Sequence, residues 1–505
     1  MPNSPFICKQ NSFSTLQLFL YQLNSIYRKY NSPFVMSRKF LLYLLLFLIC
    51  GEVLRAQSYH ALHGSPFAGS SARFNNPASP VLGAYNWEVA PMGVQLSLFS
   101  NHSWADSSGL RVRPGLLRHQ IHGNLDLGLL NFMVKLSPRL AVSAGIRART
   151  YNHYRTQPVN IVDTTSSLFS FLQDNRTTPS IGGHILHQGW LQGDINVSGV
   201  LMSNKSGRLS AGVTLQIMKG MSAAFFQMRQ VTFQEFTNPP DTAYVFTGGS
   251  GRFGLSSVYD PSININSFKD VMNQSKTSLG LSWGAEYIRW EDGEDGEEDD
   301  EEKKLLRYNW KAGISLMDLG VNRFQYAGSS RSWGDPIYPI TDGILENKLT
   351  GAPDLSSLVD SVSTLFTSIN PYTGIFRVSL PTKLIINFDK RIYKGIFVNT
   401  NLSLNLLSDA NSRHWRTREN NLLGITPRWE SRGLGVFLPV QLTQQGEIWV
   451  GAAVKIGPLT VGLHHFEITR PLSREPRLRG GGYAMLSIHP FGKKKTPGKL
   501  DCWEN

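Results

Sequence analysis

The chain has 505 residues, of which 41% are hydrophobic, 11% are aromatic and 17% are charged, and its formal net charge is +13. This composition supplies enough apolar surface for a large core, so it excludes an intrinsically disordered chain and a small domain held together by disulfides. Beyond the N-terminal region, no apolar run approaches the ~18 to 20 residues that a membrane-spanning helix requires, which excludes a helical transporter.

The N-terminal residues predict export. Residues 36–56 start with basic side chains, continue with a short apolar stretch and end in Leu-Arg-Ala. These are the features of a secretory signal peptide, and we expect cleavage between Ala56 and Gln57. Residues 1–35 show no comparable pattern, so we interpret them as an extension upstream of a true start at Met36.

After cleavage the chain would keep a single cysteine, Cys502, which excludes an internal disulfide and a cysteine-rich metal site. The basic excess is scattered apart from a basic C-terminal tail at residues 493–505. Nucleic-acid binding requires basic residues gathered on one face or in one motif, so we expect no nucleic-acid partner.

Residues 57–92 precede the first clear strand of the sequence. They contain Asn76-Pro77-Ala78, followed by Pro80. We predict that this stretch folds inward as a plug-like segment, with Asn76, Pro77 and Ala78 as candidate plug residues.

Residues 93–492 consist largely of segments in which apolar residues alternate with polar or small ones, which is the pattern of β-strands. Residues 191–201 and 209–217 alternate in this way on either side of the turn signal Ser-Asn-Lys-Ser-Gly, which predicts a hairpin. The same pattern occurs at residues 140–149, 279–287, 306–316, 396–405, 434–440, 448–454 and 459–463.

Two architectures fit alternating strands in an exported protein. A soluble sandwich uses strands of ~5 to 6 residues, whereas a membrane barrel uses ~9 to 11, with apolar residues outside and polar residues inside. The longer segments here favour an all-β, transmembrane antiparallel β-barrel of about 14 strands, closed because hydrocarbon tolerates no unpaired sheet edge. The polar side chains that we predict to face its lumen are Arg147, Asp194, Gln216, Glu286 and Lys311.

Two segments between the predicted strands do not show the alternating pattern. Residues 291–302 read EDGEDGEEDDEE, whose self-repulsion predicts an extended, solvated loop, with loose binding of divalent cations as the alternative. Residues 354–366 place apolar side chains at helical spacing behind Asp354 as a helix N-cap. This pattern predicts a short helix that lies in the lumen, over a mouth of the barrel or simply within a loop.

The sequence shows no catalytic motif. It contains no nucleophile elbow, phosphate-binding loop, metalloprotease motif or cysteine pair of useful context. His464 and His465 are adjacent, so on a strand they point to opposite faces and cannot hold one metal ion together. Serine, histidine and aspartate are plentiful, but no spacing singles out a catalytic set. We therefore expect that the chain is not an enzyme and has no catalytic residue, cofactor or metal ion.

Several short sequences together resemble a family of outer-membrane barrels of Bacteroidota that is defined by a domain of unknown function. They are Ala56-Gln57, Asn76-Pro77-Ala78, Leu-Pro-Thr-Lys-Leu at 380–384, Thr-Pro-Arg-Trp-Glu at 426–430, Leu-Pro-Val at 438–440 and Lys-Ile-Gly-Pro-Leu-Thr-Val-Gly at 455–462. The resemblance covers most of residues 57–492. It implies an outer-membrane location and a fold similar to that of fatty-acid-transporter barrels and of PorP-like components of type IX secretion.

The expected function follows from the barrel and the plug-like segment. We expect a non-enzymatic outer-membrane protein, in contact with outer-membrane lipid, that passes or binds a small hydrophobic solute or scaffolds a surface complex. An accessory role in type IX secretion or gliding, with secretion or surface-complex proteins as partners, is the alternative within the membrane. A soluble secreted β-protein is the alternative outside it.

Overall fold

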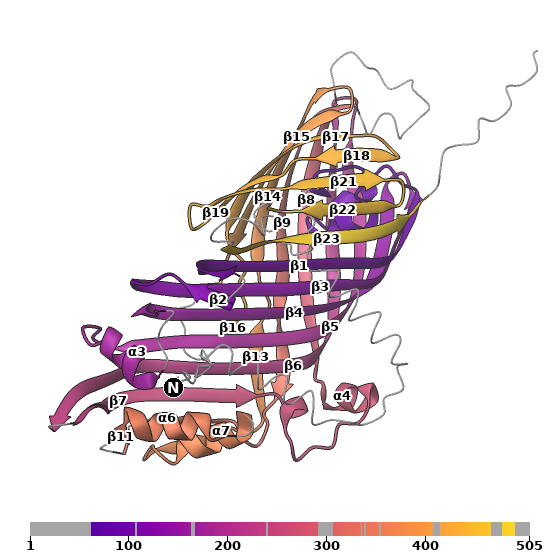
Figure 1. Cartoon of the computed structure of the whole chain (residues 1–505). Helices are drawn as coiled ribbons and strands as arrows, with labels where there is room; N and C mark the ends of the chain where they lie inside the picture. The colour runs from indigo at the N-terminus through magenta and orange to yellow at the C-terminus, as the bar shows by residue number, and fades with distance from the viewer. Residues whose placement is uncertain are drawn as a thin grey trace, which may run out of the picture.

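A closed antiparallel β-barrel of 14 strands forms the body of the protein (Figure 1). The computed structural model describes residues 62–489 except 107–108, 163–166, 239–240, 291–306, 335, 338–339, 353–354, 408–414 and 466–476. The predicted fold class is confirmed. The expected cleavage site Ala56-Gln57, the acidic run 291–302 and the tail 493–505 lie outside the described residues.

The barrel strands follow one another around the wall in chain order, and the last pairs with the first. They are β1 (Trp87–Asp106), β3 (Leu116–Ser137), β4 (Leu140–Asn160), β5 (Ile181–Ser203), β6 (Gly207–Asn238), β8 (Thr277–Trp290), β9 (Tyr308–Gln325), β14 (Lys383–Tyr393), β15 (Ile396–Asn405), β17 (Leu422–Glu430), β18 with β19 (Leu434–Phe437, Val440–Thr443), β20 with β21 (Ile448–Val450, Ala452–Ile456), β22 (Leu459–Leu463) and β23 (Arg477–Ile488). Pairs β18/β19 and β20/β21 are each one wall strand with a short interruption.

Tight turns gather at one end of the barrel, which we call the short-turn end. They join β3 to β4, β5 to β6, β14 to β15 and β21 to β22. Gly395 and Gly457 have φ values of 73° and 54° in two of these turns, a left-handed conformation that glycine adopts at low cost. Val89 near the start of β1 pairs with Ile488 at this same end, so the wall closes beside the short turns.

The opposite end carries most of the smaller elements, and we call it the long-loop end. They are β2 (Gly109–Val112), α3 (Leu168–Asp174), β7 (Asp241–Leu255), β10 (Arg331–Trp333), β11 (Ile340–Thr341), α6 (Asp342–Thr350), α7 (Leu355–Ser363), β12 (Ile369–Pro371), β13 (Ile375–Ser379) and β16 (Trp415–Arg416). η4 (Ser257–Tyr259) and α4 (Phe268–Gln274) lie in the connection from β7 to β8. Among the described residues, no helix combines the length and the hydropathy needed to cross a bilayer.

Side chains of the wall alternate between an apolar outer face and a polar inner face. Val213 on β6 is 49% exposed, whereas its neighbour Thr214 is 3% exposed. Val213 stands in register with Val197 on β5 and Trp283 on β8, and these two are also exposed. Exposed apolar side chains recur in this way on each barrel strand from β3 to β22, so they form a belt around the barrel. A soluble barrel would show the reverse arrangement.

Substitution of Val213 by Arg is expected to destabilise the barrel in a bilayer by ~2 to 4 kcal/mol, because the side chain sits within the apolar belt. The measurement is the free energy of unfolding in lipid vesicles. Ser203→Arg, at the exposed short-turn end of β5, is the control and should change the stability little. Equal effects of the two substitutions would contradict the assignment of the belt.

The first half of the wall extends far beyond the belt, because β3 to β6 are long strands. The sequence predicted only the parts 140–149, 191–201 and 209–217 of β4, β5 and β6, and it did not predict β3. β6 has 32 residues. The part of β6 nearer the short-turn end pairs with β8 as far as Lys219, and the part nearer the long-loop end pairs with β7 from Ala224 onward. The glycine-rich sequence of β7 weakens the alternation there, which explains why the sequence did not reveal this strand.

The helix predicted at residues 354–366 is present as α7, shorter than expected. It packs on β7 and β10 at the long-loop end, where Val359 contacts the cluster of Phe253 and Trp333. The lumen position considered from the sequence is therefore not the one observed. The predicted N-cap, Asp354, lies outside the described residues.

The first strand begins earlier than the sequence predicted. β1 starts at Trp87, within the stretch 57–92 that was assigned to the plug-like segment. A register shift between Val89 and Met92, beside Pro91, interrupts the alternation at this point and hides the start of the strand.

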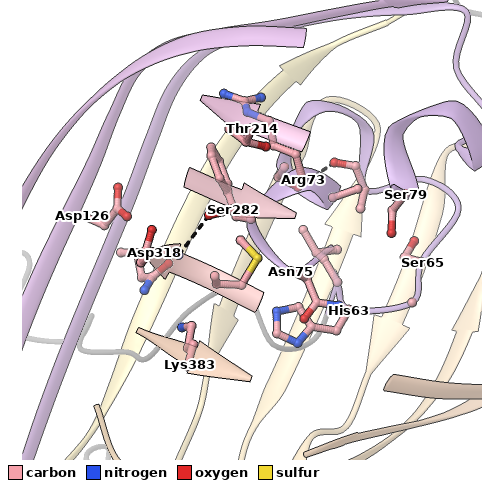
Figure 2. Close-up of a pocket in the computed structure, with 18 of the residues that line it drawn as sticks. His63, Ser65, Arg73, Asn75, Ser79, Asp126, Thr214, Ser282, Asp318 and Lys383 are labelled. Atoms are coloured by element: carbon pink, nitrogen blue, oxygen red, sulfur yellow. Dashed lines mark hydrogen bonds between the residues drawn. The ribbon is translucent and has the colours of Figure 1, made fainter. Parts of the chain in front are cut away.

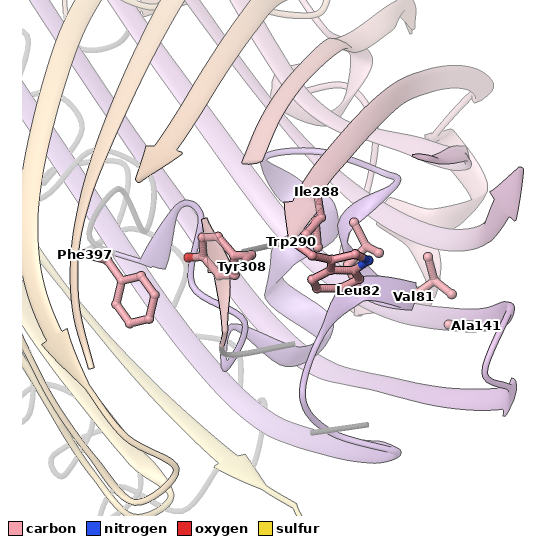
Figure 3. Packing of buried hydrophobic residues seen from close by; sticks show 7 residues of the cluster. All are labelled: Val81, Leu82, Ala141, Ile288, Trp290, Tyr308 and Phe397. Atoms are coloured by element: carbon pink, nitrogen blue, oxygen red, sulfur yellow. The ribbon is translucent and has the colours of Figure 1, made fainter. Parts of the chain in front are cut away.

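Residues 62–86, which we call the N-terminal segment, lie inside the barrel and contain the short 3-10 helices η2 (Gly69–Phe74) and η3 (Ser79–Leu82). Figure 3 shows how Val81 and Leu82 of η3 pack with inward-facing apolar residues of the wall. These wall residues are Ala141, Ile288, Trp290, Tyr308 and Phe397. All five lie toward the short-turn end, so this apolar contact fixes η3 at that end of the lumen.

Candidate functional site

The N-terminal segment is hydrogen-bonded to strands from several sides of the barrel. Ser315 Oγ on β9 donates to the Asn75 carbonyl at 2.6 Å, and Asn401 Nδ2 on β15 donates to Asn75 Oδ1 at 3.2 Å. Lys455 Nζ on β21 donates to the hydroxyl of Tyr85 at 2.6 Å. Because further partners lie on β5 and β6, the segment crosses the lumen and does not follow one wall.

The Asn76-Pro77-Ala78 sequence lies directly against the wall formed by β5 and β6. Asn196 Nδ2 donates to the Pro77 carbonyl at 3.1 Å, and Ser210 Oγ donates to the Ala78 carbonyl at 3.4 Å. A Cβ atom on Gly212 would lie 2.0 Å from the Pro77 oxygen, closer than any real contact. The structure therefore places these three predicted residues in contact with the inner wall, at a point where only glycine leaves enough space.

The segment also contributes a buried cation, Arg73. Its Nη2 donates to Asn131 Oδ1 at 2.6 Å and lies 3.9 Å from Asp194 Oδ2. The next residue, Phe74, presents its ring to the Arg147 guanidinium at 3.8 Å. A buried charge is costly unless it is paired, so these contacts hold Arg73 at one place in the lumen.

Paired charges on the inner wall surround this point. Arg147 contacts Asp194 on β5 and Asp126 on β3, with an N–O distance of 3.0 Å in each pair. Arg149 contacts Asp318 on β9 at 2.9 Å and Asp126 at 3.4 Å. Each arginine therefore faces carboxylates on two different strands, and the network is balanced within the barrel.

A second group of buried charges lies on the opposite arc of the wall. Arg428 on β17 contacts Asp389 and Glu430, each at 2.7 Å. Its Nη2 also donates to the Gly64 carbonyl at 3.2 Å, and Ser65 Oγ donates to Glu430 Oε2 at 2.5 Å. This group therefore anchors the beginning of the described N-terminal segment.

The five polar residues that the sequence placed in the lumen all point inward and are buried. Arg147, Gln216, Glu286 and Lys311 line one cavity, and Asp194 lies behind Arg147 as its partner. The cavity has a volume of about 50 Å³, enough for a few water molecules. Figure 2 shows its lining, which comes from both the N-terminal segment and the wall and includes His63, Arg73, Asp318 and Lys383.

The inner face at the long-loop end is aromatic. The rings of Phe225 and Trp415 stack at 4.1 Å, and those of Tyr326 and Tyr372 stack at 5.2 Å. The Arg252 guanidinium lies 5.2 Å from the Trp415 ring. This aromatic surface differs in chemistry from the charged lumen: Phe225 is buried within it, and Trp415, Tyr326 and Tyr372 are partly buried against it.

Three histidines lie beside it on the inner faces of β3, β4 and β5. The Nδ1 atoms of His122 and His153 are 2.7 Å apart, and the His184 ring lies 5.0 Å from that of His153. Burial and the nearby guanidinium of Arg155 lower the pKa of His184 to about 4, so its ring is neutral at pH 7. Within the part of the chain that the structure describes, no set of three or more His, Cys, Asp or Glu side chains could hold a metal ion.

Comparison with known protein families shows to which family the chain belongs. Residues 80–464 match the model of a family of unknown function, DUF5723. The chain belongs to the DUF5723 family. The match extends from η3 in the N-terminal segment of this DUF5723 member to the end of β22 in the wall. A comparison with curated proteins finds no match.

A comparison with solved structures finds matches of low similarity. A Pseudomonas aeruginosa FadL homologue is 11% identical, with 86% of this chain and 97% of that chain covered and a TM-score of 0.41. The toluene transporter TodX of P. putida is 10% identical, with 84% and 95% covered and a TM-score of 0.41. The translocator domain of the autotransporter NalP from Neisseria meningitidis is 6% identical, with 80% and 88% covered and a TM-score of 0.29.

Sequence reasoning missed several residues of this site. Asp389 and Arg428 occupy inward positions of β14 and β17, two strands that were not predicted from the sequence, although the alternation within each could have found them. Arg73 lies in a segment without periodicity, and Asp318 has a φ of 55° where β9 departs from regular geometry. No local pattern identifies these two, because their roles depend on contacts between distant parts of the chain.

Proposed function

We propose that this DUF5723 member is an outer-membrane barrel that binds or passes a small apolar solute, and that its N-terminal segment closes the lumen as a plug. The observation that carries the proposal is the path of residues 62–86 across the lumen, hydrogen-bonded to strands on several sides. The cavity beside them in the charged region measures about 50 Å³, too small for an organic solute, so we infer that the segment must move to let a solute pass through this region.

The apolar belt supports the membrane location. A closed barrel with exposed Leu, Ile, Val, Phe and Trp outside and paired charges inside satisfies its backbone in hydrocarbon and hides its charges from it. In barrels of this kind the short turns face the periplasm and the long loops face outward. The plug then begins on the periplasmic side, and the aromatic surface lies toward the outer mouth.

The aromatic surface at the outer mouth supports an apolar solute. Binding of the fluorescent apolar probe N-phenylnaphthylamine to the purified barrel is expected to weaken by ~2- to 10-fold in Trp415→Ala, the range that corresponds to loss of one aromatic contact. Trp283→Ala, which removes an indole from the outer belt, is the control. Identical affinities of the wild type and Trp415→Ala would contradict the assignment of this surface.

Native mass spectrometry of the full chain in mild detergent tests the wider proposal. A retained small apolar molecule is the expected result. Stoichiometric retention of secretion or surface-complex proteins, with no small molecule, would instead favour the accessory role. Recovery of the chain as a detergent-free soluble protein would contradict both.

A further inference from the structure

Three polar side chains on adjacent strands meet on the outer face of the barrel, away from the lumen. His187 on β5 lies between Asn152 on β4 and Ser222 on β6. Its Nε2 is 2.9 Å from Ser222 Oγ, and its Nδ1 is 2.8 Å from Asn152 Oδ1. One ring nitrogen thus contacts the serine hydroxyl, and the other contacts the amide oxygen of Asn152 on the opposite side. A serine that is activated by a histidine, which in turn is oriented by a third residue, has this arrangement.

A β-bulge brings the serine to this face. On β6, Thr214 and Gln216 lie nearer the short-turn end and point inward, so an uninterrupted alternation along this strand would also turn Ser222 inward. The register of β5 against β6 shifts between Gly189 and Trp190, which pair with Ser222 and Gly220 and leave Met221 as the extra residue. Bulges commonly re-aim side chains beside active sites, and this one turns Ser222 outward beside His187.

Glycine at position 189 makes room for the hydroxyl. A Cβ atom there would lie 2.7 Å from Ser222 Oγ, so a larger residue would displace the serine from His187. The bulge at Met221 on β6 and the glycine at position 189 on β5 lie side by side in the wall, and both favour the contact between Ser222 and His187.

A tyrosine from outside the wall completes the group. Tyr259 belongs to η4, and its hydroxyl lies 3.4 Å from His187 Nε2. Burial lowers the pKa of His187, which lies beyond the belt, to about 4. The imidazole is therefore neutral at pH 7 and can accept a proton from the serine.

We propose that Ser222, His187 and Asn152 form a hydrolytic site for carboxylic esters on the outer face of the barrel. Ser222 Oγ attacks the acyl carbon while His187 Nε2 takes the hydroxyl proton, and Tyr259 donates to the oxyanion that forms. The bond from the acyl carbon to the alcohol oxygen breaks, and His187 returns the proton to the leaving alcohol. Water then adds to the acyl carbon while His187 Nε2 takes one of its protons. The bond from the acyl carbon to Ser222 Oγ breaks, His187 returns the proton to Oγ, and a carboxylic acid, the free Ser222 hydroxyl and a neutral imidazole result.

Asn152 acts through His187 as a positioning residue. With its Oδ1 as acceptor, it holds the proton on Nδ1 and leaves Nε2 directed at Ser222. Its place on the neighbouring strand, in register with His187, fixes it relative to the ring.

The surroundings define the class of ester, and this step rests on the proposed membrane location. Toward the belt, the same outer face carries the exposed side chains of Ile146, Ile195 and Ile217, one on each of the three strands. An amphiphile in the outer leaflet would lay its acyl chain along this apolar surface with its ester at the upper edge of the belt. The substrate class is therefore an acyl ester of a membrane amphiphile.

The test uses the full chain purified and folded in detergent, with a fluorophosphonate probe and p-nitrophenyl esters of short and long acyl chains. Mass spectrometry should locate the phosphonate on Ser222. Ser222→Ala and His187→Ala should each reduce ester hydrolysis by at least ~10³-fold, and Tyr259→Phe by ~10²-fold. Ser203→Ala, an exposed serine at the short-turn end, should label and hydrolyse as the wild type does.

A pH profile tests the role of Asn152. In the wild type, hydrolysis should rise through about pH 4, where His187 loses its proton, and then level off. Asn152→Asp places a carboxylate beside the imidazole, which stabilises its protonated form and should move this rise to higher pH. An unchanged profile in Asn152→Asp would remove Asn152 from the proposal.

The absence of labelling and hydrolysis in wild-type protein that retains the heat-dependent gel mobility of a folded barrel would overturn the proposal. Hydrolysis that survives in Ser222→Ala would overturn it as well. A chain that hydrolyses esters but fractionates as a soluble protein would refute the membrane location and leave the site in place. Preference for long over short acyl chains supports the amphiphile, whereas the opposite preference refutes that substrate class.

Discussion

Arg428→Met is expected to destabilise the barrel by ~3 to 5 kcal/mol, because it leaves buried Glu430 without its cation and leaves buried Asp389 with only the more distant Lys311, 3.9 Å away. Asp389 and Glu430 each contact Arg428 at 2.7 Å, and all three side chains are fully buried. The substitution also removes the hydrogen bond to the Gly64 carbonyl and so loosens the N-terminal segment. Chemical unfolding of the protein in lipid vesicles measures the loss.

A combined variant separates the effect of charge from that of packing. Arg428→Met together with Asp389→Asn and Glu430→Gln removes the cation and both of the carboxylates it pairs with. It should recover most of the stability lost in the single variant, because no unpaired charge remains among these three residues. A triple variant as unstable as the single one would show that the packing of Arg428, and not its charge, holds this part of the lumen.

Deletion of residues 62–84 is expected to convert a closed barrel into a steadily conducting one. The segment fills the centre of the lumen, and the exposed inner wall would carry charged and amide side chains that favour water. Ion current across a planar bilayer measures the change, from no steady conductance in the full chain to a constant open level in the variant.

A shortened chain that lacks residues 493–505 is the control for this deletion and should stay closed. The deletion variant must first show the heat-dependent gel mobility of a folded barrel. If a folded deletion variant remains closed, another part of the chain blocks the lumen, and the assignment of the N-terminal segment as the plug is wrong.

The fold could be predicted from the sequence because lipid and lumen impose opposite demands on neighbouring residues. Val213 and Thr214, or Ile195 and Asp194, differ in chemistry for that reason, and their alternation indicates both the strand and its facing. The same alternation placed Arg147, Gln216 and Glu286 toward the interior. The alternation did not reveal β7, which lies beyond the belt, because its glycine-rich sequence interrupts the pattern of apolar and polar residues.

The site could be predicted only in part. That residues 57–92 fold inward was a prediction from order in the chain, whereas the partners of Asn75, such as Ser315 and Asn401, lie more than 200 residues away in sequence. The three residues on the outer face could not be predicted from the sequence for a related reason. Asn152, His187 and Ser222 follow one another at intervals of 35 residues, a distance set by hairpin length, and a bulge that no motif announces turns the serine outward.

Hydrogen–deuterium exchange of the full-length protein in lipid nanodiscs tests the central claim, that the chain carries its own N-terminal segment inside a membrane barrel. The amides of residues 62–86 should exchange as slowly as those of the neighbouring strands, because backbone bonds such as that from the Ala84 amide to the Pro66 carbonyl lie within the enclosed lumen. Complete exchange of this segment within seconds, while β5 and β6 stay protected, would show that it lies outside the barrel and would contradict the account.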